Sequence, residues 1–206
     1  ALYISHIHPD HLCPETLKHF RRDIPIVTLR DRLSLASKNL ERMGFTKVLA
    51  LSDGIGMQLG PFHVRVFDPF TTHPFHADAC ELGNVVDSAM LLTAADKSVL
   101  NCNDNTMTPE AATRFHDFYG TVDLAQLNWN PAGPYPACFR NLSPNEQLFE
   151  GRRLHAIQVD NMVAVAKALN ARAVQPFAGM FKLGFGYEHL NQYLGVTPPD
   201  VPARAL

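Results

Sequence analysis

The feature that most constrains this chain is a dense group of polar side chains directly after an apolar run at its start. The run is short and apolar, which is typical of a buried strand, and Ser5-His6-Ile7-His8-Pro9-Asp10-His11 follows it without a break. A strand that ends in a tight loop can aim alternate side chains, here His6 and His8, at one metal ion. The same loop can turn Asp10 and His11 toward a second ion. We therefore predict a dinuclear metal site at the end of this strand.

The simplest alternative is a loop that carries three surface histidines. Four potential ligands within six residues, placed at the end of an apolar strand, argue against it. Imidazole suits zinc and iron, whereas a carboxylate adds negative charge and suits harder ions. Two metals held in this way can polarise a substrate, generate hydroxide or activate dioxygen. We therefore expect an enzyme, with Asp10 as its candidate catalytic residue.

The spacing His6-x-His8-x-Asp10-His11 resembles the motif of the metallo-β-lactamase superfamily at every position. This resemblance implies an αββα sandwich, an α/β fold with a two-metal centre. It also implies that Asp104, which follows the strand-like run Val99-Leu100-Asn101, is the carboxylate that bridges the two metals. The alternative for Asp104 is a turn residue or helix cap, because Asp favours such positions in any protein.

The third ligand of the first metal is less clear from the sequence. The superfamily takes it from a His followed by Gly-Ser, in a loop before the run that ends at Asp104, and this chain lacks that pattern. We favour His76 or Asp78 as the replacement, with Glu81 and Asp87 as further possibilities. Asp87 opens a predicted strand, so anchoring a turn is its alternative role.

Several stretches are similar to the metallo-β-lactamase-like portion of CMP-N-acetylneuraminate hydroxylases and their bacterial relatives. The family's version of the motif is close to residues 3–12, and Pro176-Phe177-Ala178-Gly179 replaces the superfamily's last His ligand in the same way. Further similar patches are residues 14–18, 23–26 and 99–101. In that family a Rieske iron–sulfur domain precedes this portion, so the resemblance implies an upstream Rieske domain or another electron donor. The chain itself has no pair of Cys-x-His ligand motifs.

The numbers of histidine and carboxylate ligands indicate which metal the site prefers. The site is also similar to that of diiron β-hydroxylases, in which a carboxylate replaces a histidine ligand. Fewer histidines and more carboxylates favour iron over zinc and oxygenation over hydrolysis. We expect a diiron oxygenase that hydroxylates a small polar substrate. The alternatives are a dizinc hydrolase of an ester, amide or phosphoester, and a scaffold whose eroded site no longer turns over.

Composition excludes several other classes. With 206 residues, 46% apolar and 18% charged, the chain is expected to form one domain over residues 1–206. Its net charge of -2 and lack of a basic stripe argue against a nucleic-acid partner. No apolar run approaches the roughly 20 residues that span a bilayer, and no signal peptide opens the chain. Four scattered cysteines argue against a disulfide framework and favour a cytoplasmic setting.

Hydrophobic periodicity predicts strands that alternate with helices and are interrupted by hairpins. This order favours a mixed α/β sandwich over a doubly wound parallel sheet. Because the chain opens inside a strand, we expect the sandwich to lack its N-terminal strands and the chain to be the C-terminal part of a longer protein. Expected strands are 2–4, 24–29, 47–51, 88–93, 98–101, 122–127 and 173–176, with a hairpin over 57–67. Expected helices are 14–20, 31–43, one from 109, and one from a cap at Ser143 or Asn145 to 170, with one short helix in the tail.

Overall fold

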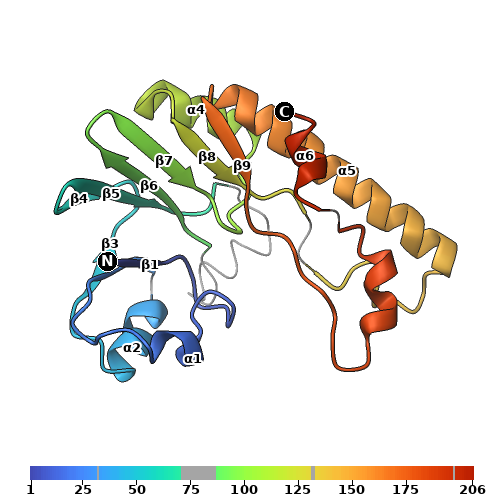
Figure 1. Cartoon of the computed structure of the whole chain (residues 1–206), viewed down its shortest axis with the longest axis horizontal. Helices are drawn as coiled ribbons and strands as arrows, with labels where there is room; N and C mark the ends of the chain where they lie inside the picture. The colour runs from blue at the N-terminus through green and yellow to red at the C-terminus, as the bar shows by residue number, and fades with distance from the viewer. Residues whose placement is uncertain (32, 71–86, 131–132, 197) are drawn as a thin grey trace. The chain divides into compact units, whose positions relative to one another are not determined.

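The computed structural model describes residues 1–31, 33–70, 87–130, 133–196 and 198–206. The chain divides into two compact units, Ala1–Met107 and Thr108–Leu206 (Figure 1). Both units lie within the single domain expected over residues 1–206, and that domain boundary stays a prediction.

The first unit begins with a parallel sheet of order β1-β2-β3. Parallel neighbours require crossover connections, and short helices supply them here. The buried and almost wholly apolar sequence of β2 is typical of a central parallel strand. The elements are β1 (Leu2–Ile4), α1 (Pro14–Leu17), β2 (Ile26–Leu29), α2 (Leu35–Arg42) and β3 (Val48–Leu51).

Two antiparallel hairpins follow in the same unit. The first turns at Gly60, whose φ of 61° is the left-handed conformation that glycine adopts without strain. The second turns at Ala95 and Asp96, between the two expected strands 88–93 and 98–101. The strands are β4 (Gly56–Leu59), β5 (Phe62–Phe67), β6 (Ala89–Ala94) and β7 (Lys97–Asn101).

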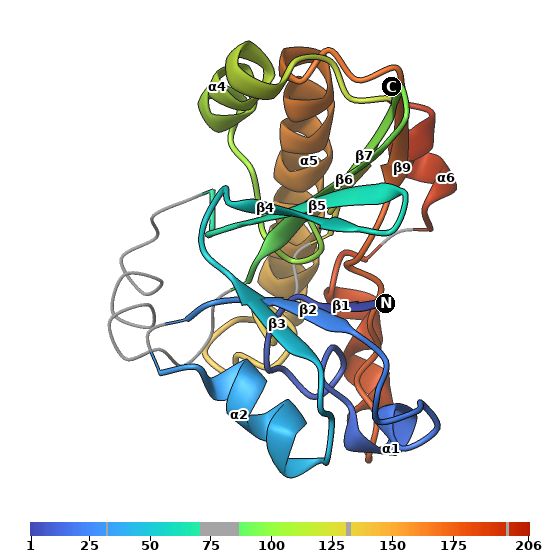
Figure 2. The same ribbon diagram turned by 90° about the vertical axis from the view of Figure 1, so that its left-hand side faces the viewer.

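Two hydrophobic clusters fill the first unit, one on each face of the parallel sheet. Alternate residues of β2 divide between them: Ile26 belongs to the cluster with Leu40 of α2, and Val27 to the cluster with Val66 of β5. Figure 2 shows the corresponding layers, with β1–β3 between α1 and α2 on one side and β4 and β5 on the other. This packing fixes the ends of β1 and β6, where the candidate ligands lie.

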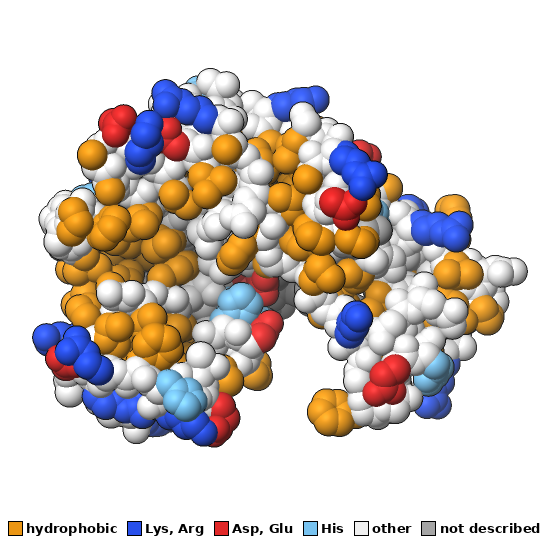
Figure 3. Space-filling view, viewed as in Figure 1, with side chains coloured by type: hydrophobic (Ala, Val, Ile, Leu, Met, Phe, Trp, Pro, Cys, Tyr) orange, Lys and Arg blue, Asp and Glu red, His pale blue; other side chains and the backbone are white. Residues whose placement is uncertain are grey.

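An apolar groove of about 510 Å³ opens beside β1 in the first unit. Its walls include Leu2, Val27, Phe62 and Met90, and hydrophobic side chains gather on this face in Figure 3. None of its lining residues is a candidate metal ligand. The groove is therefore separate from the histidine cluster.

The second unit contains two parallel strands joined by a long helix. Thr108 caps α4 by accepting a hydrogen bond from Ala111, and Ser143 forms a capping box with Glu146 at the start of α5. Ser143 is therefore the cap, and the alternative at Asn145 is wrong. The elements are α4 (Pro109–Tyr119), β8 (Leu124–Leu127), α5 (Pro144–Ala168), β9 (Ala173–Pro176), the 3-10 helix η1 (Glu188–Tyr193) and α6 (Asp200–Ala203).

Two helix predictions need correction. The helix expected from Asp31 begins at Leu35, because the Asp31 carboxylate accepts a hydrogen bond from the Leu35 amide and Ser34 adopts a φ of 54°. The tail contains two short helices instead of one. The extra one, η1, is supported by the Asn191 side chain, which bonds both backbone groups of Leu183. Hydrophobic periodicity does not report such side-chain contacts.

None of the helices in the described part of the chain combines the length and the hydropathy needed to cross a membrane.

Candidate metal centre

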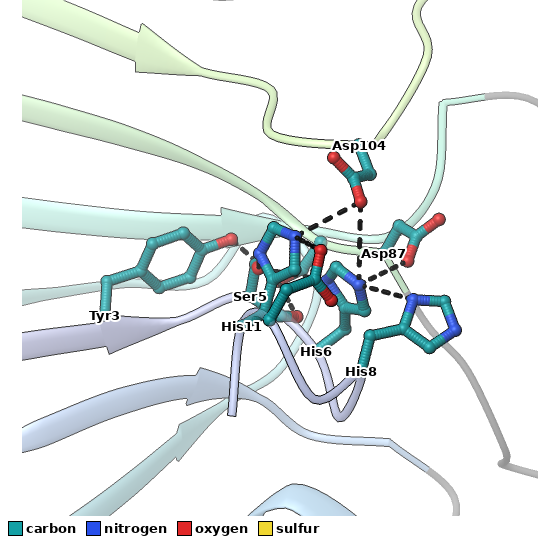
Figure 4. Close-up of polar contacts among 9 residues, drawn as sticks. Tyr3, Ser5, His6, His8, His11, Asp87 and Asp104 are labelled. Atoms are coloured by element: carbon teal, nitrogen blue, oxygen red, sulfur yellow. Dashed lines mark hydrogen bonds and ion pairs between the residues drawn. The ribbon is translucent and has the colours of Figure 1, made fainter. Parts of the chain in front are cut away.

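The histidine cluster occupies the loop that leaves β1, and backbone hydrogen bonds shape this loop. The amides of His11 and Leu12 both donate to the carbonyl of His8, at 2.9 and 2.8 Å, so the chain turns sharply. Leu12 is buried in the cluster between the parallel sheet and its helices, which anchors the far end of the turn. The ring centroid of His6 consequently lies 4.6 Å from that of His8 and 4.1 Å from that of His11 (Figure 4).

Two carboxylates from the β6–β7 hairpin face these imidazoles. Asp104 follows β7, and its Oδ2 lies 3.2 Å from the Nε2 of His11 and 3.8 Å from the Nε2 of His6. Asp87 precedes β6, and its Oδ1 lies 3.4 Å from the Nε2 of His6. Because β6 and β7 are antiparallel neighbours, the start of β6 and the end of β7 lie at the same end of the hairpin. The hairpin therefore delivers both carboxylates to one place.

The third carboxylate comes from the histidine loop itself. Asp10 is largely exposed, and its Oδ2 lies 3.5 Å from the Nε2 of His11. Solvent reaches 77% of its side chain.

The side chains form two groups that could each hold a metal ion. One group is His6, His8 and Asp104, and the other is Asp10, His11 and Asp104. Within each group the potential ligand atoms all lie within 4.8 Å of one another. The pairing of His6 with His8, and of Asp10 with His11, is the one that the sequence motif predicts. Asp104 belongs to both groups.

Of the candidates for the third ligand of the first metal, the structure describes only Asp87. His76 and Asp78, together with Glu81, lie outside the described residues. Asp87 is described and stands beside His6, although the sequence reasoning ranked it below His76 and Asp78. The sequence feature that favours Asp87 is its position just before a predicted strand. Asp87 lies two residues before β6, whose hairpin partner β7 leads to Asp104, so the two carboxylates emerge at the same end of the hairpin.

Burial and charge prepare these side chains for metal binding. Burial, helped by the neighbouring His11 and His8, lowers the pKa of His6 to about 4. The hydrogen bond between His11 and Asp104 raises the pKa of His11 and lowers that of Asp104. At neutral pH His6 is therefore neutral with a free lone pair, and Asp104 is ionised.

The donor set fits a metal that accepts nitrogen and oxygen ligands, such as zinc or iron. Cys102 lies near Asp104 in sequence, but it is buried, and burial raises the pKa of its thiol to about 12. A thiol in that state behaves as a small apolar side chain and is a poor ligand. The candidate ligands are thus imidazoles and carboxylates.

Sequence comparison finds one informative relative. No protein-family model matches the chain. A protein of Mycolicibacterium smegmatis that carries the provisional name Rieske 2Fe-2S iron-sulfur protein is 25% identical over 183 residues. The match covers 86% of this chain and 33% of the relative, so the chain spans about a third of that protein's length.

Structural comparison shows the fold. The diiron β-hydroxylase CmlA from Streptomyces venezuelae superposes with a TM-score of 0.64 and 19% identity, over 99% of this chain and 39% of that one. An isothiocyanate hydrolase from Delia radicum gut bacteria gives a TM-score of 0.60 and 14% identity, over 87% of this chain and 62% of that one. The metallo-β-lactamase fold protein YhfI from Bacillus subtilis gives 0.51 and 18%, over 94% and 68%.

These likenesses confirm the expected mixed α/β class, and the chain has a metallo-β-lactamase-like fold. The chain covers well under half of CmlA. The narrower resemblance to CMP-N-acetylneuraminate hydroxylases stays a prediction.

Proposed function

We propose that this chain carries the dinuclear metal centre of an oxygenase that hydroxylates a small polar substrate, with iron as the metal. The observation that carries the proposal is the composition of the ligand cluster. Asp87 stands beside His6, where the superfamily motif predicts that a hydrolytic zinc site has another imidazole. Two imidazoles with a carboxylate are a donor set that iron accepts, as in the facial triad of non-haem Fe(II) oxygenases.

The ligand assignment follows the two groups of side chains. We assign His6, His8 and Asp87 to the first metal, and Asp10 and His11 to the second. Asp104 is the assigned bridge, because its Oδ2 approaches His11 at 3.2 Å and His6 at 3.8 Å. His76 and Asp78 remain candidates for a further ligand.

Each residue has a distinct task in this scheme. Bound iron would supply the redox chemistry of dioxygen activation. Burial holds His6 neutral and fixes the direction of its ring. In the metal-free protein, the hydrogen bond from the Nε2–H of His11 to Asp104 keeps the His11 ring directed into the site. Asp10 reaches solvent, so its carboxylate is the candidate group to take up or release a proton on the open side of the site.

The reaction also needs a source of electrons, which these side chains do not supply. The relative from Mycolicibacterium smegmatis is named for a Rieske 2Fe–2S centre. The resemblance to CMP-N-acetylneuraminate hydroxylases points to the same kind of donor. We therefore propose a Rieske centre, on the same polypeptide or on a separate protein, as the electron donor, and we retain the cytoplasm as the expected setting.

A dizinc hydrolase is the second candidate function, because the fold is also similar to that of an isothiocyanate hydrolase. In that case the same ligands would hold zinc, which lowers the pKa of a bound water and so generates a nucleophile. The third possibility, an eroded scaffold, predicts no turnover of any substrate.

Metal analysis of protein purified without added metal separates these functions. The oxygenase proposal expects iron at about two per chain, with an oxo-bridge absorption band. Zinc at the same stoichiometry, without iron, supports the hydrolase and contradicts the oxygenase. His8→Ala should reduce the bound metal, whereas the control His19→Ala, at an exposed histidine, should not. Unchanged metal content in His8→Ala would remove the basis of the site assignment.

A further inference from the structure

Ser5 is held by its backbone carbonyl and contacts two imidazoles through its hydroxyl (Figure 4). The Tyr3 hydroxyl lies 2.7 Å from the Oγ of Ser88, and that Oγ lies 2.6 Å from the carbonyl oxygen of Ser5. The Oγ of Ser5 in turn lies 3.0 Å from the Nδ1 of His6 and 3.1 Å from the Nδ1 of His11. One serine hydroxyl therefore contacts a histidine from each of the two ligand groups.

The direction of the first two hydrogen bonds follows from their chemistry. A carbonyl oxygen only accepts, so Ser88 donates its single hydroxyl proton to Ser5. Tyr3 must then donate to Ser88. Burial raises the pKa of Tyr3, which keeps its hydroxyl protonated and able to donate. The backbone of Ser5 is thus held in place from the side opposite to the imidazoles.

The Ser5 hydroxyl has two lone pairs, and each of the two imidazoles offers it an Nδ1 atom. A neutral imidazole that binds a metal through Nε2 carries its proton on Nδ1, and the partner of that N–H selects the tautomer and the ring direction. The Nε2 atoms of His6 and His11 are the ones that face Asp104. When both histidines bind metals through Nε2, each of their Nδ1–H groups can therefore donate to one lone pair of the Ser5 hydroxyl.

We propose that Ser5 is a positioning residue for both metals: its hydroxyl accepts hydrogen bonds from the Nδ1–H groups of His6 and His11 and so keeps both Nε2 lone pairs directed at the metals. This inference rests on the proposed function only in assigning metals to these two histidines. It goes beyond the ligand assignment because it couples the two metals through one residue that binds neither of them.

Removal of the hydroxyl has a defined consequence. His6 is almost completely buried, so its Nδ1–H would lose its acceptor in a place that water does not readily reach. Without that acceptor the neutral His6 ring gains more by placing its proton on Nε2, which faces the Asp87 carboxylate at 3.4 Å. That tautomer has no Nε2 lone pair for a metal.

Histidine tautomers in the metal-free protein provide the first test. Long-range ¹H–¹⁵N NMR spectra of ¹⁵N-histidine-labelled protein, at a pH of about 9 where imidazoles are neutral, show which nitrogen carries the proton. We expect Nδ1–H at His6 in the wild type and in Ser5→Thr, which retains a hydroxyl. Ser5→Ala should move His6 to the Nε2–H form. His11 does not report on Ser5 in the metal-free protein, because its Nε2–H donates to Asp104 there. A wild-type protein with Nε2–H at His6 would overturn the proposal without any variant.

Metal affinity provides the second test, with Zn²⁺ as a redox-inert probe in competition with a chelator. Ser5→Ala should bind both ions about 10- to 100-fold more weakly, the usual effect of losing an outer-shell partner. Ser5→Thr should bind like the wild type. So should Thr28→Val, a matched control that removes a buried hydroxyl from the neighbouring strand β2. Wild-type affinity at both ions in a folded Ser5→Ala protein would contradict the proposal.

The two tests keep this inference separate from the proposed function. If the wild-type protein binds no metal, or turns over no substrate, the proposed function fails, yet the tautomers of the metal-free protein still report on Ser5. If metals bind but the tautomers of Ser5→Ala match those of the wild type, only the role of Ser5 fails.

Discussion

The Oδ1 of Asp87 lies 3.4 Å from the Nε2 of His6. The two residues come from different sheets of the first unit, since His6 follows β1 and Asp87 precedes β6. Their approach depends on the hydrogen bond by which Ser88, next to Asp87, holds the carbonyl of Ser5, next to His6. The hydrogen bond from the Ser88 hydroxyl to the Ser5 carbonyl therefore helps to hold the two proposed ligands near each other.

Asp87→Ala should lower the bound metal from about two ions per chain to about one, because it removes one proposed ligand of the first metal only. Metal analysis after gel filtration measures the change. Asp87→Glu keeps the carboxylate and should retain more metal than Asp87→Ala. Asp96→Ala, at an exposed carboxylate in the β6–β7 turn, is the control. Full metal content in Asp87→Ala would return the assignment to His76 or Asp78.

Asp104→Ala should have a larger effect than loss of Asp87, because Asp104 belongs to both groups of potential ligands. We expect little metal of either kind to remain, whereas His8→Ala should spare the second metal. Isothermal titration of the metal-free variants with Zn²⁺ distinguishes the two patterns. Retention of one tight ion in Asp104→Ala would show that Asp104 serves a single metal and is no bridge.

The metal-free protein should lose stability as the pH falls from about 7 to 4. Burial lowers the folded-state pKa of His6 from 6.5 to about 4, so in this range the unfolded chain binds a proton that the folded state does not. The full shift corresponds to about 3 kcal/mol. His11 acts in the opposite direction, because Asp104 raises its folded-state pKa, and its contribution is present at low pH and lost as the pH rises.

Comparison with His6→Gln isolates this effect. Urea unfolding at pH 7 and pH 4.5 should show a smaller decrease in the free energy of unfolding for His6→Gln than for the wild type. His19→Gln, at an exposed histidine, should behave like the wild type. Equal decreases in all three proteins would mean that His6 titrates normally.

Gly151→Ala should destabilise the second unit by about 1–3 kcal/mol through overpacking. A Cβ at this position of α5 would lie 2.4 Å from the carbonyl oxygen of Tyr193 and 3.1 Å from the amide nitrogen of Gly195. This clash outweighs the gain of about 1 kcal/mol that alanine usually brings to a helix interior. Gly184→Ala, with no atom within 4 Å of its Cβ, is the control for urea unfolding. A more stable Gly151→Ala protein would show that the backbone of the tail yields easily.

The sequence predicted the parts of this protein that local patterns determine. Apolar runs marked β1 and both hairpins, because burial requires such runs. The helix expected from 109 and the candidate cap Ser143 agree with the starts of α4 and α5, because a side-chain acceptor for free helix amides is a local need. The grouping of His6 with His8, and of Asp10 with His11, follows from the spacing of a single loop.

Features that depend on contacts distant in sequence were harder to predict. The sequence does not reveal the approach of Asp87 to His6, because the two residues are far apart in the chain and meet through the hydrogen bond between Ser88 and Ser5. The delayed start of α2 depends on the Asp31 carboxylate bonding the Leu35 amide, which periodicity does not reveal. The contact of Ser5 with both His6 and His11 depends on the turn of the loop, and sequence spacing did not indicate it.

All the described candidate ligands belong to the first compact unit, Ala1–Met107. If the proposed assignment holds, a substitution in residues 108–206 leaves all the described candidate ligands in place. The turn Phe177-Ala178-Gly179 fits such a division, because it contains no imidazole.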